Sequence, residues 1–80
     1  MTRVRYEGPI EPGMVFVAFD SKGAVYRRDM IVGRHPRKPG IILYEALPCP
    51  MRKYAEGVGE IGQCPELNLR IVMRPAEEPV

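Results

Sequence analysis

The sequence predicts an all-β domain built from five short strands, and two observations carry this prediction. Glycine and proline contribute 8 and 9 of the 80 residues, which is typical of chains with many turns and short elements. Residues that cap helices are scarce, with one serine, one threonine, one asparagine and two aspartates. A chain of this length forms one domain with one small core. We therefore expect a single small β domain over residues 1–74 and a disordered acidic tail over residues 75–80.

The first strand is expected at residues 2–6, where apolar and basic side chains alternate. In such a strand Val4 and Tyr6 would face the core, whereas Arg3 and Arg5 would face solvent. The following residues 7–13 contain two glycines and two prolines, so we expect them to form a loop.

A β-hairpin over residues 13–32 is the strongest local signal in the sequence. Its turn is Asp20-Ser21-Lys22-Gly23, in which the Asp20 carboxylate can accept hydrogen bonds from backbone amides and Gly23 can adopt a positive φ. Residues 14–19, before the turn, are apolar on both faces, as expected in a closed or two-layered sheet. After the turn, the charged residues 27–29 interrupt the apolar pattern. This interruption indicates either a β-bulge or a strand that is partly exposed on both faces.

The second half of the chain predicts two more strands, separated by loops. Residues 33–40 are expected to form a loop, and residues 41–47 a strand that ends before Pro48. One helical or 3₁₀ turn is expected at residues 51–56, followed by a second loop at residues 57–65. The last strand is expected at residues 67–74, where alternation predicts inward-facing Leu67, Leu69, Ile71 and Met73 and outward-facing Asn68, Arg70 and Arg74.

Five strands with one tight hairpin and two longer loops give a layout that resembles the small SH3-like barrels. Closure into a barrel would also remove exposed sheet edges, which a chain of this size has little material to cover. An open five-stranded α+β sheet with one short helix is the alternative. The resemblance concerns layout only, because no family motif accompanies it, and it therefore implies nothing about function.

The motifs that could carry chemistry are weak. Residues 57–62 match the pattern G-x-G-x-x-G, but no strand precedes them and no helix follows, so we interpret them as a glycine loop. Cys49, Cys64 and His35 supply three soft ligands, whereas a structural zinc site needs four, usually in close pairs. A disulfide between the cysteines would contribute about 3 kcal/mol in an oxidising compartment, but we expect reduced thiols. No third residue completes a catalytic triad with His35. We expect no enzymatic activity, no metal and no cofactor.

The uneven distribution of charge is the clearest functional signal. The net charge is only +2, yet residues 22–38 carry six cations and one carboxylate, and residues 56–66 carry three glutamates and no cation. Arginine, which suits the recognition of carboxylates and phosphates, outnumbers lysine nine to three. We expect a partner surface on the second hairpin strand and the loop after it, formed by Tyr26, Arg27, Arg28, Arg34, His35, Arg37, Lys38 and Tyr44.

These features predict a non-enzymatic binding module that contacts another protein with an acidic surface, in the manner of a small regulator or inhibitor such as a phage or mobile element encodes. The first alternative is a barrel that binds RNA or single-stranded DNA, because cations beside tyrosines suit phosphates and stacked bases. The second alternative is a structural, oligomer-forming component. No apolar run is long enough for a membrane span or a secretory signal, so we expect no membrane partner and a cytoplasmic location, in the host cytoplasm if a phage encodes the chain.

Overall fold

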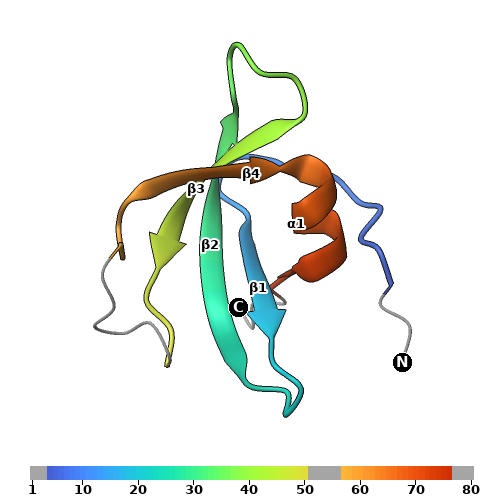
Figure 1. Ribbon diagram of the computed structural model, residues 1–80, viewed down its shortest axis with the longest axis vertical. Coiled ribbons are helices and arrows are strands. Elements are labelled where there is room, and N and C mark those ends of the chain that lie inside the picture. The colour runs from blue at the N-terminus through green and yellow to red at the C-terminus, as the bar shows by residue number, and fades with distance from the viewer. Residues whose placement is uncertain (1–3, 51–56, 77–80) are drawn as a thin grey trace.

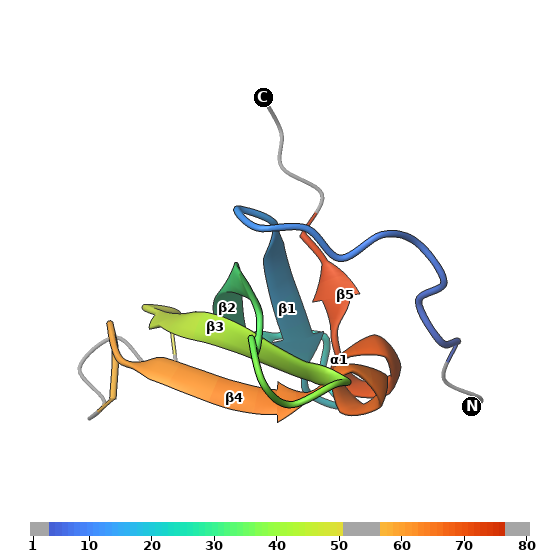
Figure 2. The same ribbon diagram turned by 90° about the horizontal axis from the view of Figure 1, so that it is seen from above.

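The computed structural model describes residues 4–50 and 57–76. They form one antiparallel five-stranded sheet, in the order β4-β3-β2-β1-β5, and one short helix that follows β4 (Figure 1). The sheet is bent, so that β3 and β4 run across the direction of β1 and β5 (Figure 2). No pairing between the end strands β4 and β5 closes the described sheet into a barrel. The elements are β1 (Val15–Phe19), β2 (Val25–Arg34), β3 (Ile41–Leu47), β4 (Ile61–Pro65), α1 (Glu66–Val72) and β5 (Arg74–Pro75).

The predicted hairpin is confirmed, and its turn has the expected hydrogen bonds. The Asp20 Oδ1 atom accepts hydrogen bonds from the backbone N–H groups of Lys22 at 2.8 Å and Ala24 at 2.9 Å. Gly23 has a φ of 82°, a value that residues with a Cβ rarely adopt. The turn therefore follows from local chemistry, and it sets the antiparallel pairing of β1 with β2.

The interrupted pattern in β2 comes from β-bulges, which was one of the two predicted explanations. Ala18 pairs with Arg27 whereas Phe19 pairs with Val25, so Tyr26 is the extra residue. A second shift in register, against β3, makes Val32 an extra residue. Beyond this second bulge the pairing continues, and β2 therefore includes residues 33 and 34, which the sequence placed in a loop.

The predicted strand at residues 2–6 is wrong for residues 4–6, which have no regular structure; residues 2 and 3 lie outside the described residues. Val4 does not face the core, because it is 74% exposed. Tyr6 does pack against the core, edge-on to Phe16 with ring centroids 5.5 Å apart. Its backbone N–H donates to the Arg70 carbonyl at the end of α1, so this segment is held by the helix and not by a strand ladder.

The expected loop at residues 57–65 is wrong at its end, where Ile61–Pro65 forms the edge strand β4. The sequence Ile-Gly-Gln-Cys-Pro has little local preference for a strand, and pairing with β3 decides its structure. The glycine at position 62 is required by packing. A Cβ there would lie 2.6 Å from the Tyr44 hydroxyl oxygen, because the tyrosine ring lies over this glycine.

The expected strand at residues 67–74 is also wrong, because most of this segment forms helix α1. Leu69 and Met73, four residues apart, are buried on the same side, as the helical period requires. Leu67 and Ile71 match a strand pattern equally well, but in the helix they are exposed. Pro65 precedes the first turn, and Glu66 and Arg70 form an ion pair one helical turn apart.

The core lies on one face of the sheet, here called the inner face, and α1 covers it. Strand pairing assigns Phe16, Ala18, Ile31, Ile42 and Cys64 to this face. These residues cluster with Ile10 from the N-terminal segment and with Leu69 and Met73. The opposite, outer face carries, in cross-strand rows, Arg74–Val17–Arg28–Leu47, Val15–Met30–Glu45–Ile61 and Phe19–Val25.

Two further regions bear on the sequence predictions. The expected turn at residues 51–56 lies outside the described residues. In the segment expected to be a tail, Pro75 belongs to β5 and Ala76 donates a backbone hydrogen bond to Val15, whereas residues 77–80 lie outside the described residues. Among the described residues, no helix has the length and apolar character needed to cross a membrane.

Candidate functional site

The residues predicted to form one basic surface lie in three different places. Arg27 pairs with the inner-face residue Ala18, whereas Arg28 pairs with the outer-face residue Val17. Because neighbouring side chains in a strand point to opposite faces, the two arginines are separated by the sheet. Arg34 ends β2, and Arg37 and Lys38 lie further along, in the loop between β2 and β3. Tyr26 packs against the core.

Arg27, Asp29 and Tyr44 form a polar cluster on the inner face. The Arg27 Nε atom donates to the Asp29 carboxylate at 2.6 Å, and Asp29 is fully buried. The guanidinium also lies over the Tyr44 ring, 5.1 Å from its centroid. Partial burial works to lower the pKa of Arg27, but the carboxylate outweighs it and holds the pKa above its usual value. The cluster holds two charges inside the fold, and Arg27 contacts both Asp29 and Tyr44 there instead of forming an exposed surface.

Cys64 lies near this cluster and is buried. Burial raises the pKa of its thiol, an effect that Arg27 opposes and Asp29 reinforces. A buried thiol with a raised pKa stays protonated at neutral pH and is a poor nucleophile. Cys49 is buried as well, and neither cysteine is in a disulfide. Within the described ranges no three His, Cys, Asp or Glu side chains come together in a way that could hold a metal ion.

His35 organises the loop between β2 and β3. Its Nδ1 atom accepts hydrogen bonds from the backbone N–H groups of Arg37 and Lys38, both at 3.1 Å. Both contacts use Nδ1 as the acceptor, and they orient the loop backbone. The side chains of Arg37 and Lys38 are exposed at this loop and form no hydrogen bond or ion pair with the described residues.

Arg34 contributes to a network that joins three segments of the chain. Its Nη1 atom and the Nε atom of Arg70 donate to the two oxygens of Glu66, the latter at 2.9 Å. These hydrogen bonds lower the pKa of Glu66. Arg70 also donates to the carbonyls of Tyr6 at 2.9 Å and Gly8 at 2.7 Å, which ties the N-terminal segment to α1. The network is structural, and it uses the charge of Arg34 inside the molecule.

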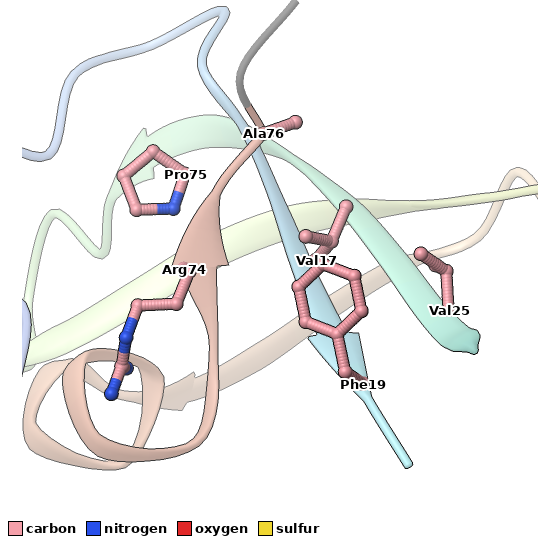
Figure 3. A pocket seen from close by; sticks show the side chains of 6 residues that line it. All are labelled: Val17, Phe19, Val25, Arg74, Pro75 and Ala76. Carbon is pink, nitrogen blue, oxygen red and sulfur yellow. The ribbon is translucent and has the colours of Figure 1, made fainter. Parts of the chain in front are cut away.

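An apolar groove lies on the outer face, where β1 meets β5 and the start of β2. It has a volume of about 400 Å³ and is lined by Val17, Phe19, Val25, Arg74, Pro75 and Ala76. Figure 3 shows Val17 and Phe19 between Val25 on one side and Arg74 with Pro75 on the other. The groove lies over Val17, which is buried, while Phe19 is 48% exposed. The groove thus combines a buried valine with a half-exposed phenylalanine in one apolar hollow.

One arginine, Arg74, lines this groove, and a second, Arg28, lies in the same cross-strand row. Val17 lies in a cross-strand row between Arg74 on β5 and Arg28 on β2. The Nη1 atom of Arg74 donates to the carbonyls of Arg70, Ile71 and Met73 at the end of α1, so the side chain is held in place. Arg28 donates to the carbonyl of Pro48 at 3.1 Å. The carbonyl oxygens at the end of α1 orient the Arg74 guanidinium, which keeps its formal positive charge at the edge of the groove.

Sequence reasoning named Arg28 but missed the groove residues. The signal was present, because residues 14–19 are apolar on both faces. That pattern was interpreted as a strand covered on both sides, whereas the outer side chains of Val15 and Phe19 remain partly or largely exposed. Arg74 and Pro75 could not be placed beside Val17, because the segment that carries them was expected to be a different strand or a tail.

Comparison of the chain with protein-family models, with curated proteins and with solved structures found no match in any of the three.

Proposed function

We propose that this chain is a non-enzymatic binding module that acts by contact with another protein through the groove on its outer face. The observation that carries this proposal is the groove itself, with half-exposed Phe19 beside it and Arg74 at its edge. The occupant is a protein segment with an apolar side chain next to carboxylates. The apolar side chain fills the groove over Val17, and the carboxylates lie near Arg74 at its edge. A role as a small regulator or inhibitor fits a module of this size.

We also propose that the bent sheet is a partly closed barrel of the SH3-like type. Support comes from the strand order, in which consecutive strands β1 to β4 are neighbours and β5 returns to pair with β1. The crossing of β3 and β4 over the direction of β1 and β5 adds to it (Figure 2). A partly closed sheet leaves the convex outer face available for contact, which is where the groove lies.

The environment of the reactive side chains supports a function without chemistry. Cys64 is buried and protonated, the Nδ1 atom of His35 accepts two backbone hydrogen bonds, and Ser21 lies in the hairpin turn. The three residues lie in separate elements, and their described contacts link none of them as a nucleophile and base. Contact, and not catalysis, is the activity that these residues support best.

The test is a selection of random peptides displayed on phage against the purified chain. We expect the enriched peptides to combine an aromatic or large aliphatic residue with Asp or Glu. Phe19→Ser should weaken their binding at least tenfold, because the apolar contact beside the groove is lost. Leu67→Ser is the matched control, since Leu67 is 53% exposed but lies on α1, away from the groove. Enriched peptides that bind both variants equally well would contradict the proposal.

The nucleic-acid alternative is tested on the same samples with fluorescent single-stranded and duplex oligonucleotides at low and high salt. We expect no binding that depends on Arg37 and Lys38, because Arg27 and Arg34 are engaged with Asp29 and Glu66. Within the described residues, the predicted basic surface then offers fewer cations to a phosphate backbone. Tight binding at low salt that falls steeply with added salt, and that is lost in the double variant R37E/K38E, would favour the alternative.

A further inference from the structure

The two edges of the sheet differ in how well they are protected. At the β5 edge, Ala76 donates its backbone N–H inward to Val15. Inward and outward backbone groups alternate along a strand, so Pro75 faces the open side, where it has no N–H to offer. A proline on an edge strand prevents further strand pairing. This edge is therefore closed to another strand.

On the β4 edge a proline also faces the open side, but Pro65 is the last residue of the strand, and two residues before it keep their outward N–H groups. Ala46 donates to the carbonyl of Glu60 at 3.1 Å, and Glu66 donates to the carbonyl of Gly40 at 2.8 Å. These bonds show that the backbone N–H and C=O groups of the even-numbered residues of β4 point toward β3. The N–H and C=O groups of Ile61 and Gln63 therefore face the open side. No strand within the described ranges pairs there. Ile61 is 58% exposed, and the Gln63 side chain is exposed too.

Opposite charges lie near the two ends of this edge. Glu60 is exposed directly before β4. At the other end, Pro65 pairs with Ile41, where the loop containing Arg37 and Lys38 joins β3 (Figure 1). Glu60 and the basic pair Arg37 and Lys38 are thus set near opposite ends of one open strand edge. An antiparallel neighbour with the same sequence would bring the basic loop of each copy toward Glu60 of the other.

We propose that two copies of this chain associate through their β4 strands, antiparallel and centred on Gly62. In this register Ile61 of one copy lies opposite Gln63 of the other, and the four outward backbone groups of each copy form a two-stranded ladder. In the symmetric pair, Glu60 of each copy lies near the basic loop of the other, so this attraction occurs twice. It favours the antiparallel orientation. The contact is independent of the groove, which lies at the opposite end of the sheet, and it leaves both grooves free.

The test is the mass of the full chain in solution, measured by sedimentation equilibrium over a wide range of concentration. We expect a monomer–dimer equilibrium that weakens with added salt. R37E/K38E should raise the dissociation constant roughly tenfold, because attractive contacts become repulsive. Adding Glu60→Lys to that variant restores opposite charges and should return the dissociation constant toward its original value. Lys22→Glu is the matched control, because Lys22 lies in the hairpin turn and its reversal should leave association unchanged.

Amide hydrogen exchange gives a second measurement that locates the contact. Exchange at the N–H groups of Ile61 and Gln63 should slow as the concentration rises, whereas exchange in the exposed hairpin turn should not change. Circular dichroism checks that every variant is folded. A monomer at all concentrations, a dimer in which these two amides are unaffected, or a failure of Glu60→Lys to restore association would each overturn the proposal.

Discussion

Arg27 and Arg28 are consecutive in the sequence, yet they lie on opposite faces of the same strand. On the inner face, Arg27 is committed to a fully buried carboxylate and an aromatic ring. On the outer face, Arg28 lies in the cross-strand row of Val17 and donates to the carbonyl of Pro48. The difference teaches that a cluster of charge in a sequence is not a surface, because a strand sends neighbouring side chains to opposite sides. The inner face holds the core and the buried ion pair, and the outer face carries the groove.

Removing the buried carboxylate should have the largest effect on the stability of the protein. Asp29→Ala should lower the free energy of unfolding by about 3–5 kcal/mol, because it leaves Arg27 partly buried without its partner. That loss approaches the whole stability of a small domain. Urea denaturation measures the change, and Glu45→Ala is the matched control, since Glu45 is a carboxylate on the outer face. Similar losses in the two variants would show that the Arg27–Asp29 pair does not stabilise the inner face.

If Asp29→Ala does not fold, the double variant Arg27→Met/Asp29→Leu still tests the role of this ion pair. Both charges are removed together, so no unpaired charge remains on the inner face. We expect this variant to be more stable than Asp29→Ala.

The packing of Tyr44 over Gly62 gives the next largest expected effect. Gly62→Ala would place a methyl group within 2.6 Å of the tyrosine ring, and we expect a loss of about 1–3 kcal/mol in thermal or urea denaturation. Gln63→Ala is the matched control, because its side chain is exposed on the outer face. Its loss should stay below about 0.5 kcal/mol. Equal losses in the two variants would mean that the inner and outer sides of β4 are packed alike.

The network around Glu66 gives the smallest expected effect, and it depends on pH. Arg34 and Arg70 hold the pKa of Glu66 below its usual value of 4.5. The stabilisation is therefore fully present above about pH 4.5 and is lost as the pH falls through the lowered pKa, where the carboxylate becomes protonated. Glu66→Gln should lower the free energy of unfolding by about 0.5–1 kcal/mol at neutral pH. The difference from the unsubstituted chain should shrink in acid, and a difference that stays constant down to low pH would show that the carboxylate charge is not involved.

Sequence reasoning succeeded where local chemistry is strong. The Asp20–Gly23 turn, the bounds of β3 and the disturbance in β2 were predictable, because turn residues and apolar runs act over a few neighbouring positions. It failed between residues 61 and 72, where a loop end and a strand were expected and the structure has β4 and α1. In the second of these segments, the alternation of Leu67, Leu69 and Ile71 fits a strand. The spacing of four residues between Leu69 and Met73 fits a helix equally well. Only packing against the inner face of the sheet decides between the strand and the helix.

The sequence by itself determined that this chain is a small domain of short strands, with one tight hairpin and an uneven distribution of charge. These properties depend on composition and on neighbouring residues. The tertiary structure decided which arginines are buried, that β5 returns to β1 to form one side of the groove, and that β4 is an end strand of the described sheet. The reason is physical: side-chain direction and strand order depend on bulges and on pairings between distant segments, and neither is contained in a local pattern.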